Sequence, residues 1–196
     1  MSCRQNDAGR RFDGITLVKQ QANDKGKVFM FSVGEYVVHR NSGICKVKEI
    51  APLPMEGGLE DTDYYFLTPI NGKSSEIFSP VSDKNGNLRK VLTEAEAQEL
   101  MRCIPELTEE MIENDKLRDA RYKEAIRSCD CRELVKILKL LNARKQKRLA
   151  EGKKCTASEE RYFKQAEENL CSELAFVFGK ERAQMQQELA EAIGFV

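Results

Sequence analysis

The fold of the first half of the chain is set by residues 30–50, which read MFSVGEYVVHRNSGICKVKEI. Apolar and polar side chains alternate from Ile44 to Ile50, as expected of a strand that buries one face. The run Arg40–Gly43 before it is typical of a turn, and Tyr36–Val38 supplies a strand on the other side of that turn. This stretch therefore predicts a β-hairpin at the start of a folded domain.

Three more strand-like runs follow. Tyr64–Leu67 is aromatic, Asn71-Gly72 is typical of a hairpin turn before Ile77-Phe78, and Leu88–Val91 can supply a fifth strand. Five short strands in about 60 residues predict a small, strongly bent sheet or barrel of the SH3 or Tudor type. We assign this domain to residues 30–92.

From Thr93 onward the apolar positions recur at helical spacing. Helix starts are expected where capping residues precede such runs: Thr93 with Glu96, Thr108, Asp130 with Glu133, and Thr156 with Glu159. Gly152 and Gly179 are expected to end two of the helices, and a last helix should run from Lys180 to about Ile193. Residues 93–196 therefore predict an all-helical bundle of four to five helices, and the whole chain a multi-domain α+β protein.

Residues 1–29 are polar and have no sustained period, so we expect a disordered N-terminal extension. Lys25-Gly26-Lys27 must be encoded by a purine-rich run that resembles a ribosome-binding site shortly before the Met30 codon. We therefore expect translation to start at Met30.

The composition indicates in which cellular compartment the protein is expected. The 196 residues carry 32 basic and 32 acidic side chains, and the sequence has no apolar stretch long enough to span a membrane. Its start lacks the apolar region of a secretory signal. Seven cysteines are scattered without a CxxC pair, as expected of reduced thiols. These features indicate a cytoplasmic protein without a membrane partner.

Catalytic and metal-binding patterns are missing from the sequence. It contains no GxSxG, P-loop or GxGxxG motif, and its single histidine, His39, would have to serve every scheme that needs a base. Cys129 and Cys131 are the only cysteines that lie close together, and their spacing would point them apart on a helix. We therefore expect no enzymatic activity, no cofactor and no metal.

Net neutrality hides a strong segregation of charge. Residues 132–154 carry nine basic and two acidic side chains. These cations either solvate a helix and complement its C-terminal dipole, or they contact the phosphates of a nucleic acid. The second interpretation makes candidates of Arg144, Lys145, Arg148, Lys153 and Lys154. The cations of the preceding helix could extend this surface.

The run Ile77–Pro80 is a candidate edge strand, because it is apolar and ends in a proline. An edge strand can accept a strand from a partner protein. The pattern alone fits equally well an ordinary strand in which Ile77 and Phe78 alternate between core and surface.

Several of these stretches resemble one family. Residues 30–38, Tyr64–Leu67 and Ile77–Val81 resemble the RNA-polymerase-interacting domain of the CarD/CdnL family of bacterial transcription regulators. Three stretches of the second half are similar to its helical DNA-binding domain: Arg121–Lys123, Gly152–Lys154, and Ala166-Glu167 leading to Glu173–Ala175. The resemblance extends over about residues 30–180.

The resemblance implies a Tudor-like domain that docks on the RNA polymerase β subunit, largely by strand addition. Leu67, Phe78 and Pro80 map near that contact, and Ile77 joins them from the edge-strand pattern. It also implies a helical domain that contacts promoter DNA at the upstream edge of the bubble, with little sequence specificity, and stabilises the open complex. The residues mapped there are Arg118, Arg121, Lys123 and Arg161. We expect the protein to act as a monomer.

The sequence departs from the family at two places. The family usually places a tryptophan in the minor groove at the fork, and this chain has no tryptophan. Met111 and Arg118 are the nearest substitutes, the first as an apolar wedge and the second through the potential of a narrow groove. Glu160 places an acid where the basic surface could continue.

Two other functions compete with this one. SH3-like barrels also occur in modules that bind RNA or the ribosome, and recovery of ribosomal RNA in place of polymerase would favour that function. A thiol redox sensor at Cys129 or Cys131 would require an unusually reactive thiolate.

Overall fold

The computed structural model describes residues 30–53, 62–70, 76–82, 86–108, 112 and 114–195. The predictions for residues 1–29, for the Asn71-Gly72 turn and for Met111 lie outside the described residues.

An antiparallel five-stranded sheet forms the first half. Its strands are β1 (Tyr36–His39), β2 (Gly43–Pro52), β3 (Asp63–Pro69), β4 (Ile77–Pro80) and β5 (Leu88–Lys90). They lie in the order β4-β3-β2-β1-β5, so β4 and β5 are the two edges. Alternating side chains bury one face, where Val37, Cys45, Val47, Tyr65 and Leu67 pack with Phe31.

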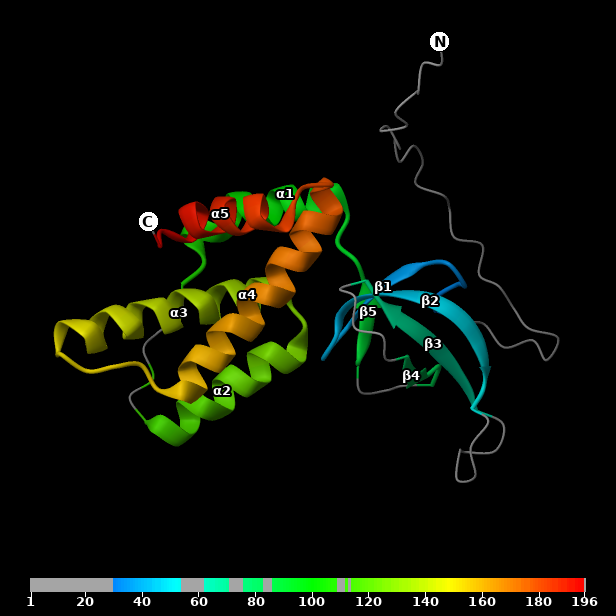
Figure 1. Cartoon of the computed structure of the whole chain (residues 1–196), viewed down its shortest axis with the longest axis horizontal. Coiled ribbons are helices and arrows are strands. Elements are labelled where there is room, and N and C mark those ends of the chain that lie inside the picture. The colour runs from blue at the N-terminus through cyan, green and yellow to red at the C-terminus, as the bar shows by residue number, and fades with distance from the viewer. Residues whose placement is uncertain are drawn as a thin grey trace, which may run out of the picture.

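The described residues of the second half form five α-helices and one 3₁₀ turn. They are α1 (Glu94–Cys103), η1 (Ile104–Glu106), α2 (Asp115–Ser128), α3 (Cys131–Ala150), α4 (Ala157–Phe178) and α5 (Arg182–Ile193). Figure 1 shows the helices on one side of the molecule and the sheet on the other, with α1 and α5 at one end of the bundle and α2 at the opposite end. The fold is the expected α+β arrangement of a β domain followed by a helical domain.

The helix starts mostly follow the sequence signals. Thr93 and Thr156 form capping boxes with Glu96 and Glu159, and Asp130 caps α3. The start expected at Thr108 is corrected by the structure. The helix there, α2, begins at Asp115, because the side chain of Asn114 accepts hydrogen bonds from two backbone N–H groups of its first turn.

Smaller differences occur at the other helix ends. Glu133 does not complete a capping box with Asp130 but pairs with cations on α2 and α3. The last helix starts at Arg182 rather than Lys180, after Glu181 at its cap position. Gly179 ends α4 as expected, with the left-handed backbone (φ 61°) that glycine adopts easily.

The helical core surrounds α4. Ala166, Leu170 and Leu174 of this helix are fully buried against apolar side chains of the other helices. Leu134, Ile137, Leu138 and Leu141 of α3 are buried in the same cluster, as the helical pattern predicted. Among the described residues, none of the helices combines the length and the apolar composition that crossing a bilayer requires.

A buried ion pair joins the sheet to the helices. Arg89 of β5 donates two hydrogen bonds, of 2.6 and 2.5 Å, to the two carboxylate oxygens of Glu173 on α4, whose side chain is only 3% exposed. Glu173 also accepts the backbone N–H of Leu92 at 3.1 Å. One turn further along α4, the ring of Phe176 lies 4.9 Å from that of Tyr36. Helix α4 therefore holds the β domain through a bidentate ion pair and an aromatic contact.

Burial opposes the charge on Arg89, but its hydrogen bonds to Glu173 outweigh that effect, so the pKa of Arg89 is raised above its ordinary value. The guanidinium also donates from Nε to the carbonyl oxygen of Cys129 at 2.6 Å. Cys129 has a left-handed backbone (φ 56°) at the end of α2, which ends that helix beside the junction. The ion pair therefore ties the sheet to the α2–α3 connection as well as to α4.

Candidate protein- and nucleic-acid-binding surfaces

The outer edge of the sheet at β4 is one candidate surface. Strand β4 pairs with β3 alone in the described sheet, with Phe66 opposite Phe78 and Leu67 opposite Ile77. Phe78 is 44% exposed, and its ring meets that of Phe66 edge-on with centroids 4.9 Å apart. This edge offers unpaired main-chain groups beside an exposed aromatic pair, which are the features that strand addition uses.

The four residues predicted for this edge divide between the two faces of the sheet. Phe78 is exposed and Pro80 is half-buried at the end of β4. Ile77 is half-buried and packs against the sheet core. Leu67 is fully buried in that core, so its side chain is not available to a partner. The structure corrects Leu67 to a core residue, and Phe66, its neighbour in β3, is the partly exposed aromatic that the sequence analysis missed.

Three predicted cations lie together, and two of them are neutralised by carboxylates. Arg118, Arg144 and Arg148 line a cavity of about 190 Å³ between α2, α3 and the start of α4. We call Arg118 and Arg144, the two with carboxylate partners, the paired-arginine cluster. Arg118 is paired with Asp115 and Arg144 with Glu159, while Arg148 donates from Nε to the carbonyl oxygen of Lys154 at 2.8 Å.

The carboxyl groups that face the paired-arginine cluster stay ionised. Burial alone would raise the pKa of Glu159, but hydrogen bonds from Thr156 and Arg144 outweigh it and lower that pKa. The hydrogen bond from Arg118 lowers the pKa of Asp115. The side chain of Arg118 is only 9% exposed, so this arginine joins helices rather than presenting a free charge.

The two remaining predicted cations of α2 are also paired. Arg121 forms an ion pair with Glu133 of α3, and its side chain is 21% exposed. Lys123 lies 2.7 Å from Asp119, but it is 52% exposed and can exchange that partner for a phosphate in solution.

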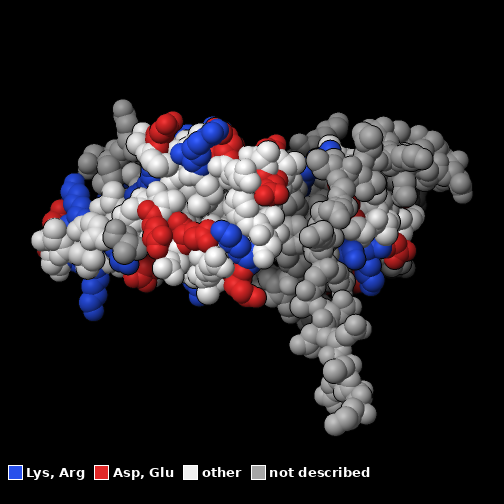
Figure 2. All heavy atoms as spheres, turned by 90° about the horizontal axis from the view of Figure 1, so that it is seen from above, with Lys and Arg blue, Asp and Glu red and all other residues white. Residues whose placement is uncertain are grey.

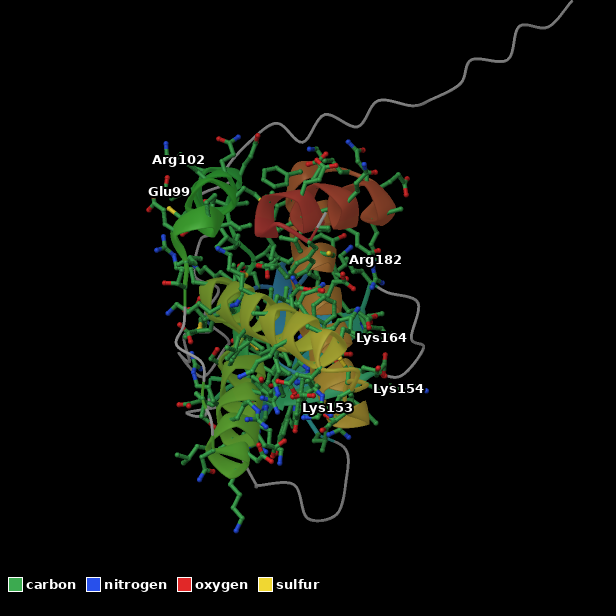
Figure 3. All side chains as sticks on the ribbon, turned by 90° about the vertical axis from the view of Figure 1, so that its left-hand side faces the viewer. Glu99, Arg102, Lys153, Lys154, Lys164 and Arg182 are labelled. Carbon is green, nitrogen blue, oxygen red and sulfur yellow. The ribbon has the colours of Figure 1, made fainter. Side chains whose placement is uncertain are left out.

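Four predicted cations are exposed. Lys145 lines a groove of α3 and α4 with Glu160 and Phe163. Lys153 and Lys154 lie in the turn after α3, where Lys153 forms a solvent-exposed ion pair with Glu151 at 2.8 Å. Arg161 of α4 lies with its guanidinium carbon 5.3 Å from the ring centroid of Tyr162. Figure 3 shows Lys154 and Lys164 on the same side of the bundle, with Arg102 on the opposite side. The predicted cations therefore do not form one face, and these four exposed ones lie on α3, in the α3–α4 turn and on α4.

The α1 and α5 side of the bundle has a mixed charge. Figure 2 looks onto this side and shows acidic groups lying among the cations. Glu94 and Glu96 occupy the first turn of α1, and Lys180 is paired with Glu188 of α5 at 2.6 Å. This side therefore lacks the excess of free positive charge that phosphate binding requires.

An exposed apolar side chain also lies on α2. Leu117, in the first turn of this helix, is 64% exposed and follows Lys116, which is exposed as well. A signal for it was present in the sequence, since a leucine between charged residues at a helix start cannot face the core together with Tyr122 and Ile126. A helix that starts at Thr108 would place Leu117 in its middle. Because the start was expected there, the position of Leu117 in the first turn of α2 was not recognised from the sequence.

Both thiols of the α2–α3 connection, Cys129 and Cys131, are buried. Burial raises the pKa of Cys129 and, more strongly, that of Cys131. A redox sensor needs a lowered pKa, so these values count against the redox function. The described residues include no cluster of three or more His, Cys, Asp or Glu side chains able to hold a metal ion.

Comparison with known protein families follows the same division of the chain. Residues 31–92 match the family described as the CarD-like/TRCF RID domain, and residues 99–190 match the CarD C-terminal domain. The chain belongs to the CarD/CdnL family. No curated protein is significantly similar to it.

CarD/CdnL proteins are non-enzymatic transcription factors that interact with RNA polymerase, and they contact its β subunit through the RID domain. The resemblance noted from the sequence is thereby confirmed. In this chain the RID domain carries the free β4 edge, and the C-terminal domain carries the exposed cations of the α3–α4 turn.

Proposed function

We propose that this protein stabilises open promoter complexes by bridging the RNA polymerase β subunit and promoter DNA, without catalysis. The observation that carries the proposal is the separation of two unlike surfaces on one chain. The β4 edge with Phe78 belongs to the RID domain, and the exposed cations belong to the helical domain. We expect the protein to act in the cytoplasm together with polymerase, as a monomer.

The polymerase end uses backbone pairing and an apolar anchor. An added strand satisfies the N–H and C=O groups along the free side of β4, and Phe78 and Phe66 bury their exposed ring area against the partner. Because this contact needs little charge, its affinity should depend weakly on salt.

The DNA end uses cations that lie exposed on the bundle, either unpaired or in ion pairs open to solvent, which a phosphate can replace. We assign phosphate contacts to Lys123, Lys153, Lys154 and Arg161, and an accessory contact to Lys145. The paired-arginine cluster and Arg121 support the positions of α2, α3 and α4 and are not assigned to DNA.

We assign to Leu117 the apolar contact with the minor groove in a chain without tryptophan. Arg118 cannot fill this role because it is buried and paired, whereas Leu117 is exposed beside a cation. Leu117→Ala should shorten the lifetime of the open complex, and Val33→Ala, at an exposed apolar side chain of the β domain, should not.

Bridging makes weak DNA binding sufficient. Once the RID domain is bound, the helical domain is held near the promoter at a high effective concentration. A factor that binds the open complex more tightly than the closed one shifts the equilibrium by the difference in affinity.

Separate binding measurements on the full chain test the proposal. Phe78→Asp should abolish binding to a purified β-subunit fragment and leave DNA affinity unchanged. Lys154→Glu should weaken DNA binding and leave binding to the β-subunit fragment unchanged. Arg102→Glu is the matched control, because Arg102 is an exposed cation on the opposite side of the bundle (Figure 3). Failure of the native chain to bind polymerase, together with recovery of ribosomal RNA, would replace this function with an RNA-binding one.

A further inference from the structure

A cleft lies where the β1–β2 turn meets helix α4. It measures about 250 Å³ and is lined by both domains. The turn contributes Asn41, Ser42 and Gly43 to the lining. Successive turns of α4 contribute six residues: Arg161, Lys164, Gln165, Glu168, Asn169 and Ser172. None of these residues belongs to the β4 edge.

The lining is rich in hydrogen-bond donors. Two cations, three amides and two hydroxyls surround the space, which are the side-chain types that contact phosphates in protein–DNA complexes. Within the described part of the chain, Lys164, Gln165 and Asn169 have no side-chain hydrogen bond or ion pair. The single carboxylate, Glu168, lies 3.6 Å from Arg182, which offsets its charge. The cleft therefore presents unused donors together with positive charge.

The turn holds its donors in place. Gly43 has a left-handed backbone (φ 71°), which a residue with a side chain would adopt only with strain, and the N–H of Ser42 donates to the carbonyl oxygen of His39 at 3.1 Å. The Ser42 hydroxyl lies 3.2 Å from Nδ1 of His39. Asn41 at the tip of this turn is exposed beside α4.

The cleft continues the DNA surface rather than forming a separate one. Arg161 lies in the cleft and belongs to the exposed cations assigned to DNA. It also helps to lower the pKa of Asp119, the partner of Lys123 on α2. In Figure 3, Lys154, Lys164 and Arg182 follow one side of the bundle. A nucleic-acid backbone lying along the α3–α4 turn would thus meet the domain junction next.

We propose that the junction cleft binds a phosphate of the nucleic-acid backbone, so that the β1–β2 turn of the RID domain also contacts DNA. This inference rests on the proposed function. The size of the cleft favours a group within a longer chain, since pockets that enclose a whole small ligand usually measure about 300–1,000 Å³.

The salt dependence of DNA binding by the full chain tests the cation in the cleft. Each phosphate contact contributes a slope of about 0.9 to the plot of log affinity against log salt. Lys164→Gln should lower the slope by that amount, and Arg102→Gln, an equal loss of charge on the opposite side, should leave it unchanged.

A second pair of variants tests the contribution of the turn. Asn41→Asp adds a negative charge at the cleft and should weaken DNA binding several-fold. Thr68→Asp adds the same charge on β3, where Thr68 is exposed outside the cleft, and should change DNA affinity little. Equal effects of the two variants would overturn the role of the turn.

Adenosine 5′-monophosphate and inorganic phosphate, added at constant ionic strength, separate the two sources of a phosphate group. Amide signals of Gly43 and Asn169 that shift with DNA but not with either small anion support the backbone assignment. Saturable binding of the free nucleotide with an unchanged slope for Lys164→Gln would overturn it. If the native chain stabilises open complexes but Lys164→Gln leaves the salt slope unchanged, only the proposal of a phosphate site in the cleft is contradicted. If the native chain does not bind DNA, the proposed function is contradicted as well.

Discussion

The two ends of the molecule present different chemistry. Strand β4 has no charged side chain of its own and presents Phe78 against Phe66, whereas the outer surface of the helices carries many cations, of which several are already paired. The difference shows that a basic sequence is not the same as a free positive surface. The paired-arginine cluster stabilises the bundle, and only its exposed neighbours can bind phosphates.

The largest expected effect concerns the junction that joins the two ends. Arg89→Ala would leave the buried carboxylate of Glu173 without its cation, which should cost about 3 kcal/mol in the free energy of unfolding. Lys90→Ala, at the exposed next residue, should change it by less than about 0.5 kcal/mol. Urea unfolding measures both values. Equal stabilities would show that the junction is not held by this ion pair.

The next largest expected difference is in how strongly salt weakens binding at the two ends of the molecule. With about four phosphate contacts, raising KCl from about 50 to 200 mM should weaken DNA binding roughly a hundredfold. Binding of the β-subunit fragment, which uses the β4 edge, should change only a few-fold over the same range. Parallel titrations of both partners check this, and similar salt slopes would remove the distinction between the two surfaces.

A smaller effect distinguishes paired from free cations within the helical domain. Arg144→Ala removes a partly buried partner of Glu159 and should lower the free energy of unfolding by about 2 kcal/mol, with no change in the salt slope of DNA binding. Lys154→Ala should lower that slope by about 0.9 and leave the stability unchanged. The reverse outcome would mean that the cluster opens toward DNA.

Local signals predicted much of this fold, and long-range pairing explains what they could not predict. Thr156 and Glu159 are three residues apart, so a capping box is visible in the sequence. Arg89 and Glu173 are separated by 84 residues, and only the packed fold shows that they meet. For the same reason the sequence could not show that Arg144 is neutralised, or that Leu67 rather than Phe78 occupies the buried face.

The smallest expected difference between the two domains is in their stability to acid, and it is absent at neutral pH. The described carboxyl groups with a lowered pKa, among them Asp115, Glu133 and Glu159, lie in the helical half. At acidic pH the unfolded state therefore binds more protons than the folded state, so the stability present above a pH of about 4.3 is lost as the pH falls below it. Amide signals of the helices should disappear at a higher pH than those of the sheet, and the opposite order would contradict this.

The lifetime of a promoter open complex after challenge with a DNA competitor tests the bridging proposal most directly. The native chain should prolong that lifetime, and Phe78→Asp should return it to the value for polymerase alone. Lys154→Glu should shorten it, and the double variant should be no worse than Phe78→Asp, because a helical domain that is not tethered to polymerase contributes nothing. A lifetime with Phe78→Asp equal to that with the native chain would contradict the proposal that the β4 edge delivers the helices to the promoter.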